Sequence, residues 1–126
     1  MLKKSIALTT GVALLAVPAS VLVAAPAHAD AERAGVCGPG NYDFSVDREG
    51  RGWEISADLD NVRAGSKWRV VLKQDGTTYF NRVRTADYEG DLDVDAYRGD
   101  SAGADKFTMH LKRVGSRTAC GSSITV

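Results

Sequence analysis

The sequence has few of the residues with which small proteins perform chemistry. It contains two histidines and two cysteines among 126 residues, and neither a C-x-x-C nor an H-E-x-x-H spacing occurs in it. A catalytic histidine needs a nucleophile and an orienting carboxylate within hydrogen-bond reach. His28 lies near the N-terminus, and His110 alternates with Thr108 and Lys112 on the polar side of an expected strand. We therefore expect no enzyme, no cofactor and no metal site.

The chain also lacks an excess of charge of either sign. Sixteen basic side chains balance 16 acidic ones, which excludes a nucleic-acid binder that depends on overall basicity. The 44% of apolar residues and the balanced charge are typical of a globular protein and exclude a disordered chain. The length is sufficient for one domain only.

Residues 1–29 have the order of a secretory signal peptide. A short basic start over residues 1–4 precedes a mostly apolar run over residues 6–25, and Ala27-His28-Ala29 forms a small-x-small cleavage site. An uncleaved membrane anchor is the alternative, since about 20 apolar residues can span a bilayer, but Pro26 and the A-x-A end favour cleavage. We expect a cleaved signal helix over 1–29, a tail and leader over 30–40, and one domain over 41–126. The expected location is extracellular, either free or associated with the cell wall.

The two cysteines, Cys37 and Cys120, lie near the two ends of the chain that remains after cleavage. An even number of cysteines in an exported protein predicts one disulfide. A bridge that closes so long a loop stabilises a fold by about 4–5 kcal/mol. A metal or catalytic thiol pair is the alternative, and it would need a C-x-x-C spacing or a histidine cluster that the sequence does not contain.

From residue 42 onward the dominant period is two, which is typical of half-buried strands. Seven strand-like segments lie around residues 42–46, 53–59, 68–72, 79–84, 92–96, 107–111 and 118–126, and apolar and polar residues alternate in most of them. Asp75-Gly76 is a hairpin signal, because tight hairpin turns need positive φ. Residues 30–36 carry no period, so an irregular tail is expected there. These segments predict an all-β fold, a seven-stranded antiparallel sandwich, with a small barrel as the alternative.

The order of these segments resembles an immunoglobulin-like or fibronectin type III-like domain over residues 42–126. Trp53 looks like the core tryptophan of fibronectin type III domains, and Leu59, Gly65 and Trp68 resemble the L-x-x-G-x-x-Y/W corner of bacterial immunoglobulin-like modules. The resemblance implies that the first, second and fifth strands form one sheet and the other four form the second. The inter-sheet disulfide and the tyrosine corner of antibody domains are missing from this chain.

A narrower likeness is to secreted antibiotic carrier proteins of the neocarzinostatin type. The similar stretches are Arg84-Thr85-Ala86-Asp87-x-x-Gly90 and the corner at Ala64-Gly65. That family carries two internal disulfides, for which this chain has no cysteines.

Two short motifs suggest binding sites. Arg98-Gly99-Asp100-Ser101 matches the integrin-binding tripeptide with its usual serine, in a glycine-rich loop; an ordinary turn is the alternative. Asp91-x-Asp93-x-Asp95 suggests calcium, but an EF-hand would need glycine and glutamate where Ala96 and Ala102 stand. Alternate side chains on a strand are also about 7 Å apart, too far for all three to hold one ion. A solvated strand face is the expectation here.

The distribution of charge over the expected strands is more informative. If Trp53 and Phe107 face inward, the outward residues of the first, second and fifth strands are acidic, and those of the remaining four strands are basic. The acidic set is Asp43, Asp47, Glu54, Asp58, Asp60, Asp91, Asp93 and Asp95, and the basic set is Arg69, Lys73, Arg82, Arg84, Lys106, Lys112 and Arg117. Val71 and Phe80 also face outward among the bases. A different strand order would instead interleave the two charges and form weak ion pairs.

We predict a secreted, non-catalytic binding module that recognises an anionic polymer or a protein through the basic set together with Phe80. A small inhibitor or toxin that acts through an exposed loop, 98–104 or 85–90, is one alternative. A structural cell-wall module that self-associates is the other.

Overall fold

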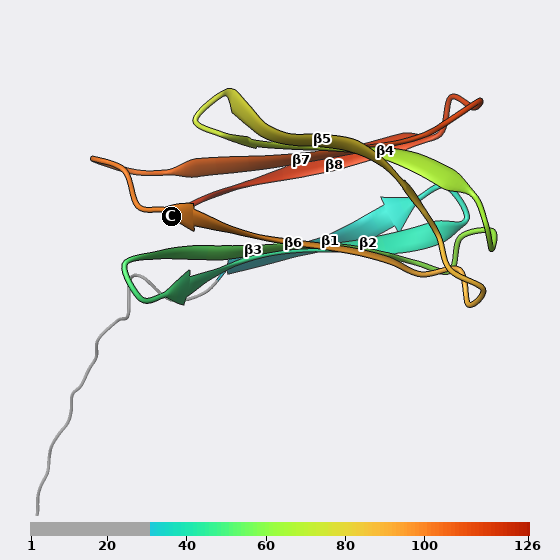
Figure 1. Ribbon diagram of the computed structural model, residues 1–126, viewed down its shortest axis with the longest axis horizontal. Helices are drawn as coiled ribbons and strands as arrows, with labels where there is room; N and C mark the ends of the chain where they lie inside the picture. The colour runs from blue at the N-terminus through green and yellow to red at the C-terminus, as the bar shows by residue number, and fades with distance from the viewer. Residues whose placement is uncertain (1–30) are drawn as a thin grey trace, which may run out of the picture.

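The computed structural model describes residues 31–126, and the expected signal peptide lies outside this range. These residues form two antiparallel four-stranded sheets that face each other as two layers (Figure 1). The strands are β1 (Ala31–Cys37), β2 (Gly40–Glu49), β3 (Gly52–Asp60), β4 (Lys67–Gln74), β5 (Thr77–Thr85), β6 (Leu92–Gly99), β7 (Lys106–Arg113) and β8 (Ala119–Thr125). The all-β sandwich is therefore confirmed. Within residues 31–126, no helix is long and apolar enough to cross a membrane.

The strands divide between the two sheets in the grouping that the immunoglobulin-like resemblance implies. One sheet has the order β1-β2-β3-β6 and the other has the order β5-β4-β7-β8. The expected first, second and fifth strands correspond to β2, β3 and β6, which are neighbours in one sheet. The charge pattern of the sequence therefore falls on two separate sheets.

The N-terminal segment differs from the prediction, because the expected tail is an eighth strand. Residues Ala31–Cys37 pair along their whole length with β2, from Ala31 opposite Val46 to Cys37 opposite Gly40. The segment AERAGVC shows no apolar alternation because β1 is an edge strand whose side chains are largely exposed. Backbone hydrogen bonds to β2, which every residue except proline can donate, hold it in the sheet.

The core lies between the inner sides of the two sheets. Its side chains come from alternate positions of the strands. The large ones that are fully buried include Phe44, Ile55, Leu59, Trp68, Leu72, Phe107, Met109 and Leu111, and Trp53 is 4% exposed. Trp53 and Phe107 both face inward, as the sequence predicts. Because alternate residues of a strand point to opposite sides, the polar residues between them are placed on the outer faces.

The β4–β5 hairpin contains the irregularity that matters most for the site. Asp75 and Gly76 adopt the expected positive φ angles, 50° and 85°. The pairing then shifts between Leu72 and Lys73, so that β5 carries one extra residue there. An extra residue moves every later side chain of its strand to the opposite face of the sheet.

The predicted disulfide is present and joins the two layers. Cys37 ends β1 in one sheet, and Cys120 lies in β8 of the other, with Cα atoms 5.4 Å apart. The bridge spans a sequence separation of 83 residues. It therefore ties the two ends of the described chain to each other across the core.

Removal of this bridge is expected to cost a large part of the stability. Reduction restores the loop entropy of the unfolded chain, so the free energy of unfolding should fall by about 4 kcal/mol. Urea denaturation followed by tryptophan fluorescence, with and without a reductant, measures the change. The double variant Cys37→Ala with Cys120→Ala should match the reduced protein and be insensitive to the reductant; equal stability of the oxidised and reduced forms would contradict the prediction.

Candidate binding faces

The outer side of the β1-β2-β3-β6 sheet is acidic. Strand pairing places nine carboxylates on this side: Glu32, Asp43, Asp47, Glu49, Glu54, Asp58, Asp60, Asp93 and Asp95. The three arginines of the same strands, Arg33, Arg48 and Arg98, pair with Phe44 or Trp53 and therefore lie on the inner side. We call these nine residues the acidic face.

A row of three aspartates crosses the acidic face. Asp58 of β3 lies directly opposite Asp43 of β2 and opposite Asp93 of β6. Directly opposed residues are about 5 Å apart, so their charges repel. Partial burial, followed by the charge and the hydrogen bond of Asp93, raises the pKa of Asp58 to about 6. Burial and Asp91 likewise raise the pKa of Asp60.

The outer side of the β5-β4-β7-β8 sheet is basic. These four strands contain eight lysines and arginines and no acidic residue. The outer side carries five of the cations, all exposed: Lys67, Arg69, Lys73, Lys106 and Lys112. We call these five residues the basic face. Arg69 and Lys112 lie directly opposite each other on it.

The predicted outward positions of Phe80, Arg82 and Arg84 are wrong. They pair with Leu72, Val70 and Trp68, whose side chains point into the core, so they lie on the inner side of the edge strand β5. The extra residue in β5 causes this reversal. Without the extra residue, Phe80 would pair with Val71, and its side chain would point outward as the regular alternation predicts.

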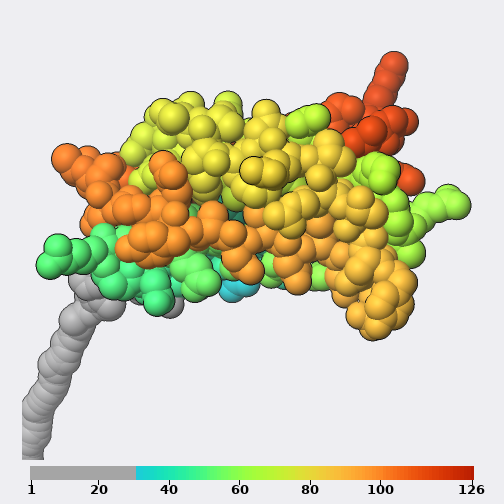
Figure 2. All heavy atoms as spheres, in the orientation of Figure 1, coloured from blue at the N-terminus to red at the C-terminus, as the bar shows by residue number. Residues whose placement is uncertain are grey.

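The reversed residues form a cluster of their own at the β5 edge. The guanidinium carbons of Arg82 and Arg84 lie 5.9 Å and 5.4 Å from the centre of the Phe80 ring. Figure 2 shows β5 in yellow on the surface that faces the viewer, above β6 in orange. These two arginines therefore extend the positive charge around the sheet edge and are not part of the basic face.

The other basic candidates fall in two places. Arg69, Lys73, Lys106 and Lys112 belong to the basic face, and Arg117 is exposed in the turn between β7 and β8. Lys67 belongs with the basic face as well. The sequence prediction omits Lys67, although the alternation that places Arg69 and Lys73 outward also places residue 67 outward.

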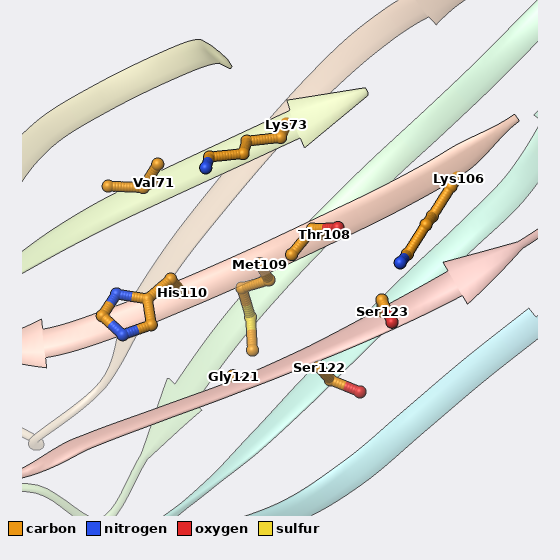
Figure 3. Close-up of a pocket in the computed structure, with 9 residues that line it drawn as sticks. All are labelled: Val71, Lys73, Lys106, Thr108, Met109, His110, Gly121, Ser122 and Ser123. Atoms are coloured by element: carbon orange, nitrogen blue, oxygen red, sulfur yellow. The ribbon is translucent and has the colours of Figure 1, made fainter. Parts of the chain in front are cut away.

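A shallow depression of about 440 Å³ lies on the basic face (Figure 3). Lys73 borders it from β4, Lys106 and His110 from β7, and Ser123 from β8. Val71 adds an apolar group to its lining, and Ser122 and Ser123 add small polar groups. The depression is open to solvent and suits a surface-bound chain better than an enclosed small molecule.

The Arg98-Gly99-Asp100 motif is engaged within the protein. Arg98 donates a hydrogen bond of 2.9 Å from Nε to Oε1 of Gln74, and its guanidinium carbon lies 4.5 Å from the centre of the Tyr79 ring. Asp100 forms an ion pair of 3.0 Å with Arg48. The two charged groups of the motif are therefore bound to other side chains, which favours the interpretation of the loop as an ordinary turn.

Asp105 closes the same end of the sandwich. Its side chain is 1% exposed and accepts hydrogen bonds from Trp53 Nε1 at 3.2 Å, Gln74 Nε2 at 3.3 Å and the Ser101 hydroxyl. Burial alone would raise the pKa of this carboxyl, but the hydrogen bonds from Ser101 and Gln74 outweigh it and lower the pKa to about 2. This anchor fixes the 99–105 loop against the core.

The same loop contains a motif that the sequence interpretation overlooked. Gly99 to Gly103 has the G-x-S-x-G spacing of a hydrolase nucleophile elbow, with Ser101 at its centre. That elbow requires a turn from a strand into a helix, whereas this loop joins β6 to β7. Ser101 donates to Asp105, whose low pKa makes it a very weak base. The spacing therefore gives no activated nucleophile.

The acidic motif at residues 91–95 is divided in space. Asp93 and Asp95 lie on the acidic face, and Ser56 donates a hydrogen bond of 2.6 Å to Asp95. Carboxylate oxygens of Asp87, Glu89 and Asp91 do come within 4.8 Å of one another in the β5–β6 loop. There Asp87 accepts hydrogen bonds from the backbone N–H groups of Glu89 and Asp91. This arrangement is a local turn in which Asp87 and Glu89 are exposed and Asp91 is half-buried.

Comparison with known proteins adds no identification, because no protein family, curated protein or solved structure matches the chain. The site is therefore defined by its geometry, namely two oppositely charged faces on the two sides of one sandwich.

Replacement of Asp58 by asparagine is expected to stabilise the protein at neutral and alkaline pH. Because the pKa of Asp58 is raised in the folded protein, its protonated form contributes favourably to the free energy of unfolding. This contribution is complete below pH 4 and is lost as the pH rises through about 6. Asp58→Asn should therefore increase the free energy of unfolding by roughly 1 kcal/mol at pH 8, after allowance for solvent screening. Little change is expected at pH 4. Urea denaturation between pH 4 and pH 8 tests this, with Glu89→Gln in the exposed loop as control; a difference that does not vary with pH would refute it.

Replacement of Asp105 by alanine is expected to destabilise the loop end of the sandwich. The change leaves the donors of Trp53, Gln74 and Ser101 without their acceptor, so the free energy of unfolding should fall by about 3 kcal/mol. Because the pKa of Asp105 is lowered, its contribution is present above pH 4 and is lost as the pH falls towards 2. Thermal unfolding at pH 7 and pH 2.5 should show a much smaller cost at the lower pH. A cost that is the same at both values would contradict the assigned charge.

Proposed function

We propose that this chain is an extracellular, non-catalytic binding module that holds an anionic polymer on its basic face. The supporting observation is that the four strands of one sheet contain eight cations and no acid. Five of these cations are exposed on a single outer side. A polyanion that lies across this side would meet positive charge from both central strands and release its counterions.

The face suits a charged polysaccharide better than a nucleic acid. Single-stranded nucleic acids are held by aromatic side chains on which bases stack, and the aromatic residues of these strands lie elsewhere. Trp68 and Phe107 are in the core, whereas Tyr79 and Phe80 lie at the β5 edge against arginines. The basic face offers cations, Val71 and small hydroxyl side chains. These groups match the phosphate, sulfate or carboxylate groups and the hydroxyls of a wall polysaccharide.

The extracellular location rests on two features. The order of residues 1–29 is that of a signal peptide, and disulfides such as Cys37–Cys120 persist in oxidising environments. The proposed kinship is with immunoglobulin-like or fibronectin type III-like sandwiches. It is supported by the grouping of β2, β3 and β6 against β5, β4, β7 and β8.

A second candidate function is suggested by the β5–β6 loop. Tyr88 is 87% exposed at this loop, and the hydrogen bonds that Asp87 accepts from the backbone order its neighbours. A large exposed aromatic on an ordered loop is a common anchor of protein–protein contacts. In this second function the chain is an inhibitor whose loop inserts Tyr88 into a pocket of the target protein.

Polyanion binding is tested with the double variant Arg69→Ala with Lys112→Ala. Retention on a heparin column should fall, and the slope of log affinity for a heparin oligosaccharide against log salt should decrease by about 2. The matched control, Arg33→Ala with Arg51→Ala, removes two cations outside the basic face and should retain most of the binding. Arg82→Ala with Arg84→Ala should have an intermediate effect, and Tyr88→Ala should have none. Equal losses in all three charge variants would contradict a specific face, and a loss with Tyr88→Ala would favour the loop.

A further inference from the structure

The acidic and basic faces lie on opposite sides of the sandwich, because each is the outer side of a different sheet (Figure 1). The two faces of one molecule therefore cannot contact each other, whereas those of two molecules can. We propose that copies of this chain stack head to tail, with the acidic face of one copy on the basic face of the next. This inference goes beyond the proposed function, because the occupant of the basic face is a second copy.

The central strands of the two faces have matching charge patterns. The outward residues of β3 are Glu54, Ser56, Asp58 and Asp60, and those of β4 are Lys67, Arg69, Val71 and Lys73. When β3 is read in reverse, its three acids oppose the three bases of β4, and the neutral Ser56 opposes Val71. An antiparallel arrangement of β3 on β4 thus pairs each charge with its opposite.

A simple translation of one copy produces this arrangement. Residues 61–66 connect β3 to β4 at one end of the sandwich, so the two strands run in opposite directions and Asp60 and Lys67 lie at the same end (Figure 1). Within one copy β1 lies against β8. A second copy shifted along the normal to the sheets therefore places its β3 over β4, its β2 over β7 and its β1 over β8.

The same translation brings the two most charged rows together. The row Asp43–Asp58–Asp93 crosses three strands of the acidic face, and Arg69–Lys112 crosses two strands of the basic face. Asp58 opposes Arg69, and Asp43 opposes Lys112. Repulsion within each row, which a single molecule has to tolerate, is offset by the opposite row of its neighbour.

The size of the faces predicts weak association. Four strands are about 19 Å wide and eight residues are about 27 Å long, so each copy buries roughly 500 Å². The total of about 1,000 Å² is at the lower limit of specific interfaces. Because the contact is heterologous and uses opposite sides of each copy, it does not close into a dimer and extends into a stack.

Small-angle scattering and sedimentation velocity of the oxidised, exported chain test the proposal. At about 20 mM salt the mean mass should increase continuously with concentration, and about 500 mM salt should reverse this because it screens exposed charges. The acidic-face variant, Asp58→Asn with Asp93→Asn, should associate about tenfold more weakly. The basic-face variant, Arg69→Gln with Lys112→Gln, should behave in the same way. Arg33→Gln with Arg51→Gln is the control and should associate like the wild type.

A mixture of the two face variants gives the decisive result. Each variant retains one intact face, so a 1:1 mixture should form a heterodimer that does not grow further. Wild-type protein that stays monomeric at millimolar concentration in low salt would overturn the proposal, as would a closed dimer that both variants still form.

This outcome is separable from polymer binding. The acidic-face variant should bind heparin at least as well as the wild type while it loses self-association, because its basic face is free. Loss of heparin binding in the basic-face variant alone supports the proposed function whether or not the copies stack. Stacking without heparin binding would refute the proposed function and leave the stacking inference intact.

Discussion

The shared core of the two sheets is the constraint on which the other features of this molecule depend. Both sheets bury alternate side chains, among them Ile55 and Leu59 of β3 and Trp68 and Leu72 of β4. Because the alternation has a period of two, burial of one set fixes the position of the other. The charges of each strand therefore face outward as a consequence of core packing. The acidic and basic faces exist because the strands of each sheet carry charges of one sign at those positions.

The cost of these faces is small and is spread over many residues. Opposed like charges destabilise a sheet, but on an exposed surface solvent and salt screen much of the repulsion. Asp58 and Asp60 are the exceptions, because burial together with a neighbouring aspartate raises the pKa of each. The inter-layer disulfide, which connects the first and last described strands, and the buried network around Asp105 provide compensating stability.

The short motif at residues 98–103 has a structural role at the loop end of the sandwich. Arg98, Asp100 and Ser101 belong to a sequence that matches both an adhesion tripeptide and a hydrolase spacing. Each of the three binds a side chain of the same protein: Gln74, Arg48 and Asp105. The motif therefore contributes to closing the sandwich, and only the tertiary structure reveals its partners.

The sequence alternation predicts the direction of side chains correctly in some strands and wrongly in others. The alternation around Trp53, Trp68 and Phe107 correctly predicts inward and outward residues wherever the strands pair regularly. At β5 it fails from Phe80 onward, because one extra residue shifts the pairing with β4. At β1 it fails for a different reason, since an edge strand with exposed side chains needs only backbone hydrogen bonds.

By itself the sequence determined the strand segments, the hairpin at Asp75-Gly76, the cysteine pair and the sign of charge on most outward positions, because these follow from local periodicity and turn chemistry. The tertiary structure alone decided the bulge that turns Arg82 and Arg84 away from the basic face, the partners of Arg98 and Asp105, and the opposition of Asp43, Asp58 and Asp93. These features depend on pairing between residues distant in the chain. Such pairing is a balance of packing over the whole core, which no local pattern encodes.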